Sequence, residues 1–237
     1  MLKQFDERRD LAVPGKRPIA LAFCVEHFIR CASQCIEDRG AFHVALSGGS
    51  TPKAIYQILT SDHFADKVNW EKVHLYWSDE RCVPPTDSES NYKMTMDAGF
   101  DRLPIPKEQI HRMEGELDPE EAAERYAKVL PQMMDLILLG MGDDGHTASL
   151  FPDTEALDED EKSVVANYVP QKKSWRLTLT IPYINSARGI VFYVFGKEKK
   201  SMIRQVLRRA EKYPAGRVGR DGRRALWICD TDAWGKI

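Results

Sequence analysis

The sequence lacks the features of a secreted, zinc-bound or membrane-spanning protein. It has five cysteines, an odd number, and no Cys-x-x-Cys pair, which argues against a disulfide framework and a structural zinc site. No apolar run approaches the roughly 20 residues that cross a bilayer, and the charged segment 1–10 has no apolar core of a signal peptide. We therefore expect a cytoplasmic protein with buried cysteines and no membrane partner.

The sequence also lacks a large excess of charge. Its formal net charge is −2, so the chain as a whole gives no electrostatic reason to bind nucleic acid. The segment 197–224 is locally basic, with eleven Lys and Arg residues against three Asp and Glu residues. Because aromatic residues are not interleaved with these charges, we interpret the segment as a solvated helix face and expect no nucleic-acid partner.

What is present is the pattern of a layered α/β domain. The composition, 43% hydrophobic and 30% charged over 237 residues, suits a globular protein with a sizeable core. Predicted strands alternate with predicted helices, which favours a mostly parallel sheet with helices on both faces. We expect a single domain over 1–237, with room for a small excursion. The predicted strands are 42–46, 73–78, 136–139, 164–169, 177–181, 190–195 and 225–228. The predicted helices are 18–39, one following Thr51, 91–98, 120–130 and 197–210.

Three polar turns follow predicted strands, at 47–51, 79–81 and 140–146. Right-handed crossovers between parallel strands place such turns at one edge of the sheet, where open α/β sheets bind their ligands. The three turns are therefore expected to form one site.

The first turn, Ser47-Gly48-Gly49-Ser50-Thr51, leads from a strand into a helix. Backbone N–H groups at a helix start attract phosphate or another anion, so we expect an anion to bind here. Thr51 is expected to cap the helix. The spacing matches neither a P-loop nor a dinucleotide-binding motif, and a capped turn without ligand is the alternative.

The second turn, Asp79-Glu80-Arg81, places two carboxylates beside a guanidinium. Arg81 offers a fork of donors to an oxyanion, and Asp79 could orient it or bind substrate hydroxyls. An ordinary surface ion pair is the alternative for this segment taken alone.

The third turn contains His146. Of the six histidines in the sequence, it is the only one in a glycine-rich turn at the end of a predicted strand. Asp144 could set its tautomer and raise its basicity, as proton transfer near neutral pH requires. A metal site built from Asp143, Asp144 and His146 is disfavoured, because no second His or Cys cluster supports it.

Together these segments make the chain resemble the 6-phosphogluconolactonase family. The matching motifs cover nearly the whole chain in the right order: SGGSTP at 47–52, SDERCVP at 78–84 with Ser90-Asn91 after it, GMGDDGHTASLFP at 140–152, RLTLT at 176–180, Gly196-x-x-Lys199 and Pro214-Ala215-Gly216. Related glucosamine-6-phosphate deaminase/isomerases usually have an aromatic residue where this chain has Arg81. The chain departs from the family at Asp143, usually proline, and at Lys200, usually a small residue.

The resemblance implies a Rossmann-like fold and hydrolysis of 6-phospho-D-glucono-1,5-lactone to 6-phospho-D-gluconate, with neither metal nor organic cofactor. Opening a lactone requires a base on water and charge stabilisation at the carbonyl oxygen, and we expect His146 to be the base and Arg81 to stabilise the oxyanion. Asp144 either orients His146 or holds substrate hydroxyls. The remaining residues expected in substrate binding are Gly48, Gly49, Ser50, Thr51, Asp79, Asn91, Gly145, Arg176 and Lys199.

Several alternatives stay open. Arg81, Arg176 and Lys199 could each hold the phosphate. A glucosamine-6-phosphate deaminase/isomerase-like enzyme and a non-catalytic sugar-phosphate sensor are the rival functions. We expect a sugar-phosphate lactone as the small-molecule partner and a monomer or small homo-oligomer.

Overall fold

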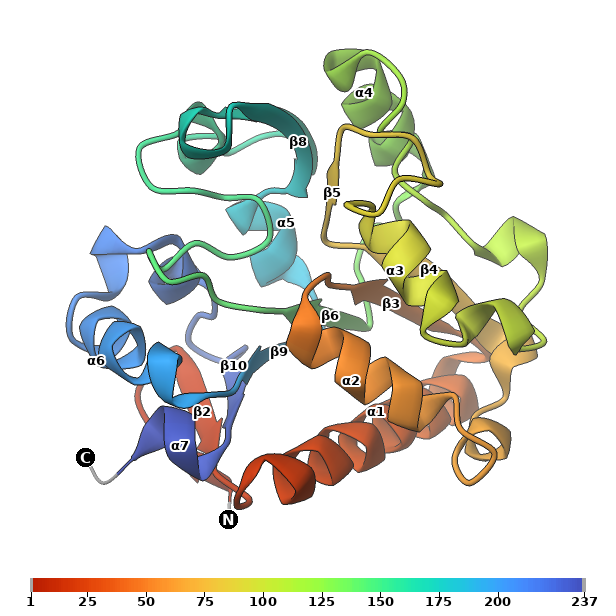
Figure 1. Cartoon of the computed structure of the whole chain (residues 1–237), viewed down its shortest axis with the longest axis horizontal. Coiled ribbons are helices and arrows are strands. Elements are labelled where there is room, and N and C mark those ends of the chain that lie inside the picture. The colour runs from red at the N-terminus through yellow and green to blue at the C-terminus, as the bar shows by residue number, and fades with distance from the viewer. Residues whose placement is uncertain (1, 236–237) are drawn as a thin grey trace.

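The computed structural model describes residues 2–235 and has a seven-stranded sheet at its centre (Figure 1). The strand order is β1-β2-β10-β9-β6-β3-β4, and every neighbouring pair is parallel except β1 with β2. This confirms the predicted α/β class. The strands of this sheet are β1 Leu2–Gln4, β2 Arg9–Ala12, β3 Phe42–Leu46, β4 Val73–Trp77, β6 Leu136–Leu139, β9 Gly189–Val194 and β10 Ala225–Cys229.

Helices cover both faces of the large sheet. The longer ones are α1 Arg17–Arg39, α2 Ser50–Leu59, α4 Pro119–Val129 and α6 Lys200–Arg208, and the shorter ones are α3 Asn91–Asp97, α5 Ile181–Ser186 and α7 Thr231–Trp234. Alternate strand residues point to opposite sides, so the core divides in two. Leu138 packs on the side of α1 and α2, and Leu139 packs on the side of α5 and α6.

Helix α1 corrects one expectation from the sequence. By length and composition it is apolar enough to cross a membrane, although no apolar run was expected to approach that length. Its side chains explain the pattern, because Ala20, Cys24, Val25, Phe28, Ala32 and Cys35 are buried against the sheet. The helix is thus a core element of this fold.

Beside the large sheet the chain forms a second, three-stranded sheet. Its order is β5-β8-β7, with β5 Asp79–Arg81, β8 Ser174–Leu179 and β7 Val164–Val169, and both pairs are antiparallel. Strand β5 begins two residues after β4 ends, so the chain passes from the large sheet into the small one at Ser78. Figure 1 shows β5 and β8 above the large sheet, with α4 at the upper right of the view.

Several element boundaries differ from the predicted ones. The hairpin β1–β2 was not predicted, and the turn 79–81 is itself a strand. Helix α2 begins at Ser50 after Gly49 and has no side-chain cap, so the predicted capping role of Thr51 is wrong. Strand β8 starts earlier than predicted and ends at Leu179, because Thr180 caps α5 by accepting a hydrogen bond from the Tyr183 N–H.

Candidate active site

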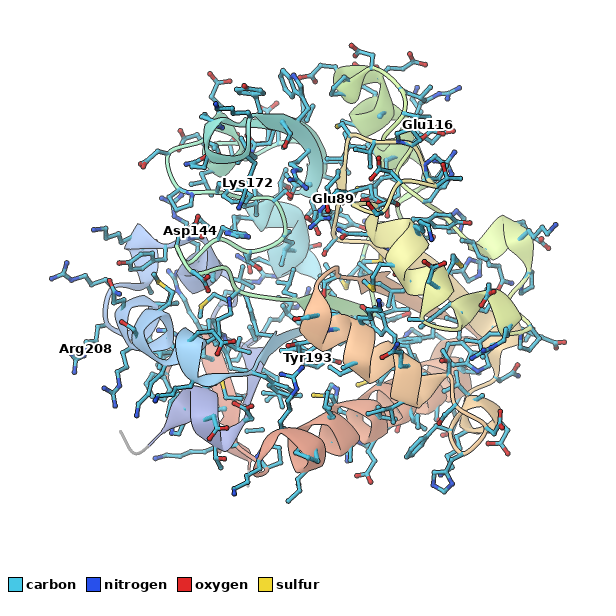
Figure 2. The ribbon with its side chains drawn as sticks, viewed as in Figure 1. Glu89, Glu116, Asp144, Lys172, Tyr193 and Arg208 are labelled. Carbon is cyan, nitrogen blue, oxygen red and sulfur yellow. The ribbon has the colours of Figure 1, made fainter. Side chains whose placement is uncertain are left out.

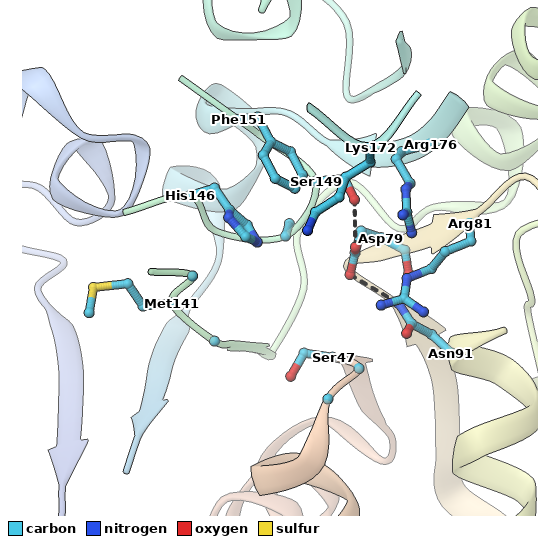
Figure 3. A pocket seen from close by; sticks show the side chains of 15 residues that line it. Ser47, Asp79, Arg81, Asn91, Met141, His146, Ser149, Phe151, Lys172 and Arg176 are labelled. Carbon is cyan, nitrogen blue, oxygen red and sulfur yellow. Dashed lines mark hydrogen bonds between the residues drawn. The ribbon is translucent and has the colours of Figure 1, made fainter. Parts of the chain in front are cut away.

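The three predicted turns do meet, in one cavity of about 290 Å³ at the carboxyl edge of the large sheet (Figure 3). The large sheet contributes the ends of β3 and β6, and the small sheet contributes β5 and β8. The lining residues are Ser47, Gly48, Gly49, Asp79, Arg81, Asn91, Gly140, Met141, Gly142, His146, Ala148, Ser149, Phe151, Lys172 and Arg176.

His146 is held from two sides. Its Nδ1 lies 2.6 Å from Asp144 Oδ1, and its ring stacks on Phe151 with centroids 3.9 Å apart. Because a carboxylate only accepts hydrogen bonds, Nδ1 carries the proton and Nε2 is left as the basic nitrogen. A Cβ atom at Gly142 would overlap the imidazole, so this turn needs glycine to admit the ring.

The Asp144 carboxylate remains ionised well below neutral pH. Burial alone would raise its pKa, but the hydrogen bond and the charge of His146 outweigh burial and lower the pKa to about 2. A stable carboxylate beside an imidazole supports the imidazolium that forms when the ring takes a proton.

Arg81 and Arg176 face each other across the β5–β8 pair. Arg81 donates to the Glu89 carbonyl, and its Nη1 lies 3.8 Å from the Glu89 carboxylate. Arg176 has no such partner, since its buried Nε meets no acceptor within residues 2–235. Burial, and then the nearby charge of Arg81, lower the Arg176 pKa. Two facing guanidiniums with an unused buried donor give this wall of the cavity the charge and the free donor that an anion requires.

Asp79 is buried and oriented by two neutral donors. Ser149 Oγ donates to Asp79 Oδ2 at 2.7 Å, and Asn91 Nδ2 donates to Asp79 Oδ1 at 3.2 Å (Figure 3). A Cβ atom at Gly48 would overlap Asn91 Oδ1, so the first turn packs directly on this pair. The remaining acceptor positions of Asp79 can bind hydroxyl groups in the cavity.

Glu80, the middle residue of the second turn, has a structural role. Its carboxylate accepts from the backbone N–H groups of Arg81, Asn91 and Tyr92 at 2.7–2.9 Å, and from Ser90 Oγ at 3.0 Å. Burial raises its pKa, and these hydrogen bonds oppose the rise. The contacts tie β5 to the start of α3 and hold Asn91 at the cavity wall.

Five predicted site residues lie outside the cavity lining, namely Ser50, Thr51, Asp144, Gly145 and Lys199. Asp144 is hydrogen-bonded to His146, which does line the cavity, and Ser50 and Thr51 form the first turn of α2. Gly145 packs against Tyr213 and adopts a left-handed conformation, with φ 82°. Lys199 Nζ lies 2.6 Å from Asp143 Oδ1, so the unusual acidic residue of the third turn is paired with a cation.

The lining also includes residues that the sequence did not single out, chiefly Ser149, Phe151 and Lys172. Ser149 and Phe151 follow His146 closely in the sequence, and this position could have indicated that they line the same cavity. Lys172 lies in the turn between β7 and β8, and its approach to the cavity depends on how the small sheet packs.

Known proteins share both the sequence and the fold. The model of the family "Glucosamine-6-phosphate isomerases/6-phosphogluconolactonase" matches residues 19–227. A 6-phosphogluconolactonase of Chlamydia pneumoniae is 38% identical, with 98% of this chain and 92% of that protein covered. One of Haemophilus influenzae is 36% identical, with coverages of 81% and 85%.

Solved structures agree. The structure of a devB protein matches with a TM-score of 0.88 at 32% identity, and the match covers 97% of this chain and 99% of the devB chain. The 6-phosphogluconolactonase of Thermotoga maritima has a TM-score of 0.80 at 28% identity, with coverages of 94% and 99%. The chain therefore belongs to the glucosamine-6-phosphate isomerase/6-phosphogluconolactonase family.

Proposed function

We propose that this protein hydrolyses 6-phospho-D-glucono-1,5-lactone to 6-phospho-D-gluconate, the second step of the oxidative pentose phosphate pathway. The names of its relatives support this reaction. The observation that carries the proposal is the Asp144–His146 pair beside a cavity whose other wall holds Arg176, with a buried Nε that meets no acceptor among the described residues. A base and an anion site in one cavity are what the hydrolysis of a phosphorylated lactone requires.

His146 activates the water. Its Nε2 takes a proton as the water oxygen attacks the lactone carbonyl, and Asp144 stabilises the resulting imidazolium through Nδ1. The tetrahedral intermediate then collapses, the bond from the carbonyl carbon to the ring oxygen breaks, and the imidazolium returns its proton to that oxygen. A well-placed base of this kind contributes about 10²–10⁴ in rate.

The cations of the small sheet serve charge stabilisation and binding. Arg81 stabilises the oxyanion, where one donor contributes roughly 3–4 kcal/mol. Arg176 binds the phosphate, together with backbone N–H groups of Gly48 and Gly49 ahead of α2. Asp79 and Asn91 bind sugar hydroxyls, and Lys199 is a further candidate for the phosphate.

No step of this mechanism uses a metal or an organic cofactor. A cytoplasmic location, a monomeric or small homo-oligomeric state and the absence of nucleic-acid and membrane partners stay predictions.

A coupled assay tests the proposal. Freshly made lactone is added, and 6-phosphogluconate is followed by its oxidation, with the spontaneous rate subtracted. His146→Ala should reduce the enzymatic rate to near the spontaneous rate, whereas His63→Ala, a change at an exposed histidine, should not. Wild-type kcat in folded His146→Ala would refute the assignment of the base. Ammonia release from glucosamine 6-phosphate would indicate the rival deaminase, and ligand binding without turnover would indicate a sensor.

A further inference from the structure

The turn between β7 and β8 directs one lysine into the cavity. Residues 170–172 form a single 3-10 turn, and Lys173 closes it in a left-handed conformation with φ 49°. Gln171 Nε2 donates to the Pro152 carbonyl at 3.3 Å, which ties the turn to the segment after His146. Lys172 consequently lines the cavity, whereas the adjacent Lys173 does not. Figure 3 shows the Lys172 side chain entering between His146 and Arg176.

The cationic side chains around this cavity differ in whether a carboxylate forms an ion pair with them. Arg81 is engaged by Glu89, and Lys199 is paired with Asp143. Across residues 2–235, no carboxylate lies within ion-pair distance of the Lys172 ammonium or the Arg176 guanidinium. The cavity thus contains two positive charges that no carboxylate of the described residues pairs.

We propose that Lys172 is a specificity-determining residue that binds the substrate phosphate together with Arg176. The inference rests on the proposed function and deepens it. A phosphate dianion carries close to two negative charges at neutral pH, which two unpaired cations can match. Arg176 supplies a planar fork of donors from β8, and Lys172 supplies a mobile point charge from the turn that precedes β8. An uncharged lactone would leave both cations unmatched in the cavity.

Two neighbouring lysines provide a matched pair of variants. Lys172→Met and Lys173→Met each remove one charge from the same exposed turn, and each is assayed on the phosphorylated lactone and on phosphate-free glucono-1,5-lactone. Lys172→Met should raise the KM for the phosphorylated lactone roughly 10- to 100-fold, as expected for losing a hydrogen bond to a charged group. Its kcat should change little, and Lys173→Met should behave like wild type. Lys172→Arg should recover most of the affinity.

Activity on the phosphate-free lactone separates the possible roles. Lys172→Met should lower kcat/KM much less on that lactone than on the phosphorylated one. An equal loss of kcat on both lactones would overturn the proposal, because Lys172 would then act at the carbonyl. An unchanged KM for the phosphorylated lactone would overturn it as well.

Calorimetric titration with 6-phosphogluconate provides a readout that needs no turnover. Weaker binding to Lys172→Met than to Lys173→Met supports the proposal even if the wild-type protein hydrolyses no lactone. Equal affinities of Lys172→Met and Lys173→Met would refute the role of Lys172. This result is independent of whether the protein hydrolyses the lactone, so the two proposals can fail separately.

Discussion

Replacing Arg176 with methionine should make the protein more stable and, at the same time, a weaker binder of its ligand. In the unliganded protein Arg176 faces Arg81 across an antiparallel pair, and its buried Nε has no acceptor in the described chain. Like charges placed directly opposite each other cost up to about 1 kcal/mol, and an unsatisfied buried donor costs about 1–3 kcal/mol. Methionine retains the apolar part of the side chain and removes both costs.

The net gain should be roughly 2 kcal/mol, or about 4–8 °C in Tm for a chain of this size. Arg208, an exposed residue on α6 at the outer edge of the molecule (Figure 2), provides the control. Arg208→Met should change stability by less than about 0.5 kcal/mol.

Adding ligand should reduce the difference in stability between Arg176→Met and wild type, because the ligand binds wild type more tightly. At a 6-phosphogluconate concentration of about 100 Kd, wild type gains about 2.7 kcal/mol. If Arg176→Met weakens binding about 10- to 100-fold, the variant gains only about 0.4–1.4 kcal/mol at that concentration. Thermal unfolding with and without ligand measures both quantities.

Two outcomes would refute this reasoning. If unliganded Arg176→Met melts below wild type, Arg176 contributes to the fold and the unsatisfied donor is not a cost. If both proteins gain equally from the ligand, Arg176 does not bind the phosphate.

Three further predictions concern the base, acid stability and the core. Asp144→Asn should lower kcat about 10²–10⁴-fold with little change in KM, measured by steady-state kinetics. Burial lowers the pKa values of His27 and His74 to about 4, with smaller effects of Arg30 on the first and of neighbouring histidines on the second. The unfolded chain therefore binds more protons, and urea unfolding should show stability falling as the pH drops from about 6.5 to 4. Trp77 is fully buried, and Trp77→Ala should cost about 3–5 kcal/mol in the same assay.

Much of the fold could be predicted from the pattern of apolar residues in the sequence. Strands β3, β4, β6, β9 and β10 were predicted within one or two residues, because each is an apolar run between turns. The hairpin β1–β2 was missed because its strands have three and four residues and include charged side chains. Such short strands owe their stability to pairing, here of β2 with β10, which a local pattern does not reveal.

The site was predictable where its residues come shortly after strands of the large sheet in the sequence. His146, Asp79 and Gly48 were placed together because parallel strands end at one edge. Lys172 was not predictable, because its position depends on β7 and β8 pairing with β5 in a separate antiparallel sheet. The partners of Lys199 and Arg81, an aspartate and a glutamate from other turns, likewise emerge only from tertiary packing.

The division of the cavity between two sheets places the base and the β7–β8 turn on different sheets. The base belongs to the large sheet, whereas Arg81 and Arg176 belong to the small one. Ser78 links the two sheets. Its N–H donates to the Leu46 carbonyl of the large sheet, and its carbonyl accepts from the Leu179 N–H of the small sheet. New turns between β7 and β8 could therefore redirect the same hydrolytic centre toward lactones with other charged groups, while the histidine and its aspartate stay untouched.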